Sequence, residues 1–137
     1  MRRMLLAFAL SLALSPAIAD EAGMAAARSV VEGQIRAFQR GDDAAAYAFA
    51  APGIKRIFPT LDSFMGMVTN GYQPVQKPKS FAFGTAEQPS PTTVIQRVQL
   101  VGPDGKDYEA VYTLELQPDG SFLITGVSLN ASSALSI

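Results

Sequence analysis

The chain has 137 residues, a formal net charge of −1 and neither cysteine nor histidine. This length suits one ordinary domain with a single core. The weak, unclustered charge argues against a nucleic-acid partner, because phosphate binding depends on Lys and Arg gathered on one face. No disulfide can form, and nucleophilic triads that need His or Cys are excluded, as is zinc held by thiolate or imidazole.

The N-terminus has the pattern of a cleavable secretory signal peptide. Two arginines precede an uncharged apolar run over 5–14, and Pro16 and small residues follow. This run is too short for a membrane span, which needs roughly 20 apolar residues. The general secretory route fits better than the twin-arginine route. We therefore expect 1–19 to be the signal peptide, cleaved between Ala19 and Asp20, and the mature protein to be periplasmic or secreted without a membrane span.

Apolar residues recur at spacings of three and four over 20–40, which predicts an amphipathic α-helix with Gln34 on its polar face. Gly41 suits a C-terminal cap, and Asp42 can cap a second helix over 43–50. The first helix is therefore expected to end here, with a short one directly after it. The apolar stripe of the first helix consists of Met24, Ala27, Val31, Ile35 and Phe38.

Pro52 and Gly53 are expected to end the second helix, and 54–58 has the pattern of a brief extended segment. Thr60 suits the N-cap of a third helix that ends at Gly71. Apolar residues in this helix fall at i, i+3, i+4 and i+7, which predicts one buried stripe. They are Leu61, Phe64, Met65 and Val68.

Beyond Tyr72 the apolar period changes from near 3.6 to 2, and turn residues bound each segment, which indicates strands. Two of the loops contain Asp-Gly, a strong hairpin signal because a tight turn needs residues that accept positive φ. We expect the last three strands to form an antiparallel meander and 131–137 to be a flexible tail. The predicted strands are 75–87, 92–101, 106–117 and 121–130.

The predicted fold is α+β, a single domain over 20–130 with three N-terminal helices packed on one face of a curved antiparallel sheet of about four strands. This order resembles the nuclear transport factor 2-like folds, a cone-shaped superfamily related in shape to cystatins. Three motifs are Val31-x-x-Gln34-Ile35-x-Ala37-Phe38-x-x-Gly41-Asp42, Phe64-x-x-Met67-Val68-x-x-Gly71-Tyr72-x-Pro74-Val75 and Ile124-x-Gly126-Val127-x-Leu129. They resemble a bacterial exported family known only as a domain of unknown function, which implies a fold and export but no activity.

Proton transfer is the one enzymatic alternative that the residues leave open. In cone-fold isomerases and dehydratases a buried Asp takes a proton while Tyr stabilises an oxyanion. Here Asp62 is expected in the first turn of a helix, where the dipole favours a carboxylate. Glu109 and Glu115 are expected on the sheet face opposite Tyr112. We therefore expect a non-enzymatic protein without catalytic residues, cofactor or metal, and keep proton transfer by Tyr and Asp as the alternative.

Tyrosines and the apolar residues of the third helix are suited to line a pocket between helix and sheet, in which phenol hydroxyls orient a ligand. The competing expectation is that these aromatic residues are simply core. An isolated arginine is suited to hold a ligand carboxylate. The expected partner is a small apolar ligand or another periplasmic protein, with a homodimer through the sheet as a further possibility. The candidate ligand-binding residues are Tyr47, Phe64, Tyr72, Tyr112 and Arg97.

Overall fold

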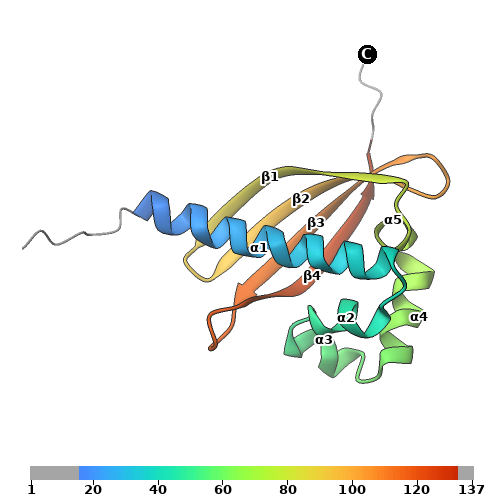
Figure 1. The fold of residues 1–137 in the computed structure, drawn as a ribbon, viewed down its shortest axis with the longest axis horizontal. Helices are drawn as coiled ribbons and strands as arrows, with labels where there is room; N and C mark the ends of the chain where they lie inside the picture. The colour runs from blue at the N-terminus through green and yellow to red at the C-terminus, as the bar shows by residue number, and fades with distance from the viewer. Residues whose placement is uncertain (1–15, 133–137) are drawn as a thin grey trace, which may run out of the picture.

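The computed structural model describes the backbone of residues 16–132 and the side chains of 21–132. The predicted apolar run over 5–14 and most of the predicted tail lie outside the described residues, so cleavage after Ala19 stays a prediction. No helix in the described part of the chain is long and apolar enough to cross a membrane. Within this part, five helices precede four strands (Figure 1): α1 (Pro16–Gln39), α2 (Asp43–Ala48), α3 (Pro52–Ile57), α4 (Leu61–Gly71), α5 (Gln73–Gln76), β1 (Ser80–Ser90), β2 (Thr93–Val101), β3 (Asp107–Leu116) and β4 (Phe122–Ala131).

The strands form one antiparallel sheet in the order β1-β2-β3-β4, which confirms the predicted meander and the α+β class. Gly105 and Gly120, in the two Asp-Gly turns, have φ values of 78° and 87°. These values lie in the left-handed region that favours glycine, so the turn chemistry sets the hairpins. Register irregularities interrupt the β1–β2 ladder at two places along β1.

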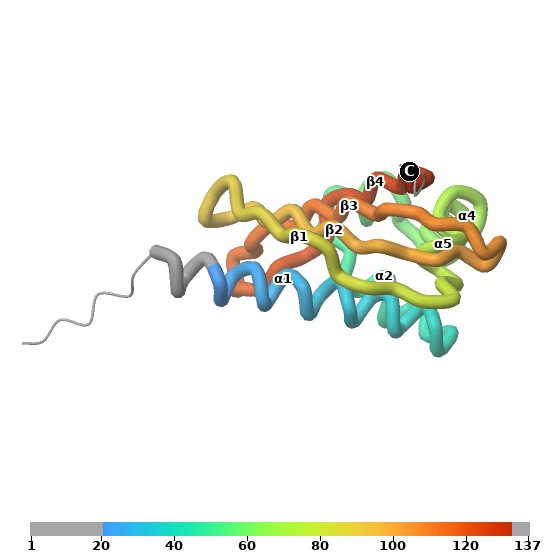
Figure 2. The backbone as a smooth tube through the Cα atoms, turned by 90° about the horizontal axis from the view of Figure 1, so that it is seen from above, coloured from blue at the N-terminus to red at the C-terminus, as the bar shows by residue number. Residues whose placement is uncertain are grey.

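Helix α1 lies across one face of the sheet, and the four shorter helices gather toward one end of it (Figure 1). Viewed from above, α1 and the sheet form two layers (Figure 2). The core lies between these layers, where the alternation along β3 buries Ala110, Tyr112 and Leu114 against the helices. The largest fully buried side chains are Tyr112, Ile35, Leu100, Leu114, Ile124, Gln96, Val31, Val94 and Val98.

Two local features of the predicted helices need correction. Pro52 does not end α2 but opens α3, because a residue without a backbone N–H fits the first turn of a helix. The predicted extended segment 54–58 is therefore mostly helical. Val75 lies in α5 instead of the first strand, again with a proline, Pro74, in the first turn, and β1 begins only at Ser80. The prediction of three helices was thus too low by these two short ones.

The connection between α2 and α3 joins the helices to the edge of the sheet. Ala50 forms a parallel bridge with Ile124 of β4. The N–H of Ala51 donates to the carbonyl of Ile124 at 2.8 Å, and the N–H of Ile124 donates to the carbonyl of Phe49 at 2.9 Å. A Cβ on Gly33 would lie 2.7 Å from Cζ of Phe49, so the absent side chain allows this ring to pack against α1. These contacts hold the α2–α3 connection against both α1 and β4.

Candidate functional site

A cavity of about 240 Å³ lies between the helices and β4. Its wall is built by α1, α3, α4, α5, the connections between them and the first half of β4. Aliphatic and aromatic side chains make up most of this wall. The lining residues are Gln34, Phe38, Ala50, Ile54, Phe58, Phe64, Met67, Val68, Tyr72, Val75, Ile124, Thr125, Gly126 and Val127.

A capping box sets the start of α4 and therefore the face that α4 presents to the cavity. The hydroxyl of Thr60 accepts from the N–H of Ser63 at 3.1 Å, and the hydroxyl of Ser63 accepts from the N–H of Thr60 at 3.2 Å. With the helix start determined, Phe64 and Val68 fall one turn apart and both are buried. Met67 lies beside them on the cavity wall.

The aromatic ring of Phe64 packs against two other rings, of which Phe38 also lines the cavity and Tyr47 does not. It stacks on Phe38 with centroids 6.4 Å apart and lies 4.8 Å from the ring of Tyr47. The hydroxyl of Tyr47 donates to the carbonyl of Phe58, and Lys55 Nζ lies 5.2 Å from the Tyr47 centroid. Phe64 thus lines the cavity as the sequence predicts, whereas Tyr47 supports the wall and is not part of its lining.

Two hydroxyl groups on the wall bond to backbone carbonyls of the sheet. The hydroxyl of Tyr72 donates to the carbonyl of Val127 at 3.2 Å, which ties the junction of α4 and α5 to the edge of β4. The hydroxyl of Thr125 donates to the carbonyl of Thr113 at 3.1 Å. Tyr72 therefore takes the predicted place on the cavity wall and also closes one side of it.

Gln34 corrects the predicted polar face of α1. Its side chain is buried, with only 4% of the residue exposed, and it lines the cavity. Residue 34 lies three positions after Val31 and four before Phe38, so helical geometry places it beside the apolar stripe. Nε2 of Gln34 donates to the carbonyl of Ala46 at 3.2 Å, which makes burial of the amide tolerable. The position of Gln34 between two residues of the apolar stripe could have indicated its burial, but its polar residue type led to the opposite prediction.

The family model described as "Domain of unknown function (DUF4864)" matches residues 20–137. The chain belongs to this family. The match covers every residue of the DUF4864 cavity wall. Comparison with curated proteins and with solved structures found no match.

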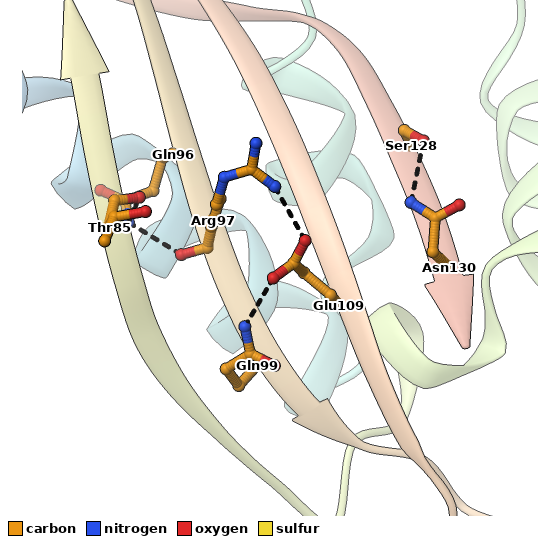
Figure 3. A network of polar contacts seen from close by, with 7 residues as sticks. All are labelled: Thr85, Gln96, Arg97, Gln99, Glu109, Ser128 and Asn130. Atoms are coloured by element: carbon orange, nitrogen blue, oxygen red, sulfur yellow. Dashed lines mark hydrogen bonds and ion pairs between the residues drawn. The ribbon is translucent and has the colours of Figure 1, made fainter. Parts of the chain in front are cut away.

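Besides Tyr47, two further predicted site residues of this DUF4864 protein lie away from the cavity wall. Tyr112 is fully buried in the core, where its hydroxyl has no hydrogen-bond partner among the described residues. Burial raises the pKa of this phenol, because the anion would lose its hydration. Arg97 is on the sheet face that points away from the helices (Figure 3). Its Nη1 lies 2.8 Å from Oε1 of Glu109, and Nε2 of Gln99 donates to Oε2 of the same carboxylate at 2.8 Å.

None of the described residues on the DUF4864 cavity wall carries a carboxylate or a basic group. Asp62 lies exposed in the first turn of α4 as predicted, and Glu109 and Glu115 lie on the outer face of the sheet. The three acidic residues considered for proton transfer are therefore not among the described residues that line the cavity. Among the residues that the structure describes, no group of three or more acidic side chains is placed to hold a metal ion.

Proposed function

We propose that this DUF4864 protein is a non-enzymatic binding module that holds one small, largely apolar molecule outside the cytoplasm. The cavity is the observation that carries the proposal, since ligand sites are concave, mostly apolar and equipped with a few polar groups. An apolar cavity of about 150 Å³ binds benzene. At the same volume per atom, the 240 Å³ cavity accommodates a molecule of roughly ten non-hydrogen atoms.

The size of the ligand sets its expected affinity. Small ligands gain between about 0.3 and 1.5 kcal/mol per non-hydrogen atom. A value of about 0.5–0.8 kcal/mol over roughly ten atoms gives a binding free energy of about 5–8 kcal/mol. This corresponds to a Kd between about 1 and 200 μM. The protein is thus expected to release its ligand readily, as a carrier or sensor does.

Export and a cone-shaped fold belong to the same proposal. The family match begins at Asp20, the first residue after the predicted cleavage point, which supports the assignment of 1–19 as a signal peptide. Helices over one face of an antiparallel sheet, with a cavity toward one end, support the likeness to the nuclear transport factor 2-like folds. Mass spectrometry of the protein recovered from the periplasm or medium tests export, and an intact N-terminus would contradict the predicted cleavage.

Native mass spectrometry of protein purified from its own compartment tests the ligand. We expect a bound molecule in the mass range of roughly ten non-hydrogen atoms. An empty protein that also fails to bind small apolar probes in calorimetric titration would contradict the proposal.

A matched pair of substitutions on α4 locates the bound molecule. Met65 and Met67 are both partly buried, but only Met67 lines the cavity. Met67→Trp is expected to fill part of the cavity and weaken binding at least about tenfold, whereas Met65→Trp adds the same side chain outside the cavity and leaves binding unchanged. Urea titration of both variants verifies that they fold. Unchanged affinity in folded Met67→Trp would place the ligand elsewhere.

We favour a small ligand over a homodimer formed through the sheet. The outer face of the sheet carries the Arg97–Glu109 ion pair, with side chains that remain 38% and 29% exposed. A dimer through this face would remove both charges from water, which costs several kcal/mol per ion before any gain. We expect the protein to sediment as a monomer. A dimer that the Arg97→Ala substitution dissociates would instead support the interface through the sheet.

A further inference from the structure

We infer that the cavity selects a neutral molecule with a hydrogen-bond donor, such as an alcohol, a phenol or an indole N–H, and rejects carboxylates. This inference rests on the proposed function, because it names the ligand class of the same cavity. It follows from the direction of the hydrogen bonds that the polar side chains of the wall already make.

Gln34 presents an acceptor. A backbone carbonyl accepts only, so the 3.2 Å bond to the carbonyl of Ala46 identifies that end of the amide as the NH₂ group. Oε1 is then the remaining end, and it accepts no hydrogen bond from any residue of 21–132. The residue is only 4% exposed and lies on the cavity wall. Oε1 is not among the buried side-chain atoms without a partner, so water can reach it in the empty cavity. An apolar ligand that displaces this water leaves the acceptor unpaired, and a donor on the ligand replaces the lost hydrogen bond.

The two hydroxyl groups on the wall also present acceptors. Tyr72 gives its only hydroxyl proton to the carbonyl of Val127, and Thr125 gives its proton to the carbonyl of Thr113. Each oxygen keeps lone pairs but has no further proton to donate. These polar side chains therefore offer a ligand mainly acceptors, and the second N–H of the Gln34 amide is the one side-chain donor among them that no described residue uses.

Charge strengthens this selection. No Lys or Arg of the described residues lines the cavity, so a ligand carboxylate or phosphate would lose its hydration without a cation to replace it. No Asp or Glu of the described lining residues is present either, so the charge of a ligand ammonium group would have no carboxylate to balance it. Ketones, ethers and esters have no proton to give to Oε1 of Gln34 or to the two hydroxyl oxygens. A hydroxyl or a neutral N–H at one end of an apolar body remains.

Three probes of similar length test the inference on the unmodified protein: octanol, heptyl methyl ether and octanoate. The ether has the same non-hydrogen atoms as the alcohol but no donor. We expect calorimetric titration to show octanol binding about tenfold more tightly than the ether, as one net hydrogen bond provides. Octanoate is expected to bind more weakly than both. If the ether or octanoate binds as tightly as octanol, the inference is wrong.

Two variants test whether Gln34 causes the preference for octanol over the ether. Gln34→Leu keeps the size of the side chain and removes the acceptor, so we expect it to bind octanol and ether equally. Gln39→Leu changes an exposed glutamine on the same helix and should keep the preference for octanol. A folded Gln34→Leu protein that still prefers octanol about tenfold would show that another group receives the proton.

The same titrations separate this inference from the proposed function. If octanol, ether and octanoate all fail to bind, the cavity is not a ligand site and the proposed function fails. If they bind without preference for the donor, the protein still binds apolar molecules and only the ligand class is wrong. The comparison on the unmodified protein decides both questions even if Gln34→Leu does not fold.

Discussion

Tyr112→Phe is expected to stabilise the protein, although it removes a polar group from the middle of the sheet. The phenol is fully buried and its hydroxyl has no partner among the described residues. Leaving a buried hydroxyl unsatisfied costs about 1–3 kcal/mol. Removing it leaves a small void whose cost is about 1 kcal/mol. The expected net gain in the free energy of unfolding is therefore about 1 kcal/mol, or about 3–5 °C in Tm for a domain of this size.

Urea titration measures this gain in the free energy of unfolding. The slope of that free energy against urea concentration should stay unchanged, which shows that the folded and unfolded states keep their compactness. Tyr47→Phe is the matched control, because the hydroxyl of Tyr47 donates to the carbonyl of Phe58. The control is expected to lose about 1 kcal/mol. If Tyr112→Phe is instead destabilised by as much as the control, the hydroxyl of Tyr112 makes a hydrogen bond in solution and the reasoning is refuted.

The dependence of folding stability on alkaline pH is a second measurement for Tyr112→Phe. Burial raises the pKa of Tyr112 above its ordinary value of about 10. Above that pH the unfolded chain releases this proton while the folded protein keeps it, so folding stability falls as pH rises. This contribution has a limiting slope of about 1.4 kcal/mol per pH unit. We expect the unmodified protein to lose stability above pH ~10 faster than Tyr112→Phe by about this slope, and parallel curves would contradict burial of the phenol.

Two further substitutions test local contacts. Tyr108→Phe removes the hydroxyl that donates to Asp104 and is the main cause of the lowered pKa of that carboxyl. NMR titration should show the pKa of Asp104 rising toward its ordinary value of about 3.9. A lowered pKa stabilises the folded state above the unfolded value and the benefit is lost as pH falls through the folded value, so the variant should lose less stability on acidification. Thr60→Ala removes the cap of α4 and is expected to cost about 1 kcal/mol in urea titration, and a cost of only a few tenths would argue against the capping box.

Short-range chemistry made much of the fold predictable. Asp42 accepts from the N–H of Ala45 at 3.1 Å, Thr60 caps α4, and Gly41 has a φ of 74°, each as expected from residue type and position. The same holds for the two Asp-Gly turns of the meander. These features depend on a few neighbouring residues, so a sequence pattern contains all the information that they need.

Features that depend on tertiary packing were harder to predict. Proline ends some helices and opens others, and only the neighbours of Pro52 in space favour the second outcome. Gln34 was placed on the polar face because of its residue type, whereas the carbonyl of Ala46 satisfies its buried amide. The cavity wall draws on residues from Gln34 to Val127, and no local pattern brings such distant segments together. Of the predicted ligand-binding residues, Phe64 and Tyr72 line this wall.

The way in which the helices meet β4 also bears on aggregation. An unpaired strand edge is a template on which another chain can add a strand. Here the backbone of Phe49 and Ala51 bonds to β4 at Ile124, and the hydroxyl of Tyr72 occupies the carbonyl of Val127. At the opposite edge, register irregularities along β1 make a continuous ladder with a second chain difficult. Tyr72 therefore serves two properties at once, since the side chain that closes the cavity also covers part of an edge that would otherwise be open to polymerisation.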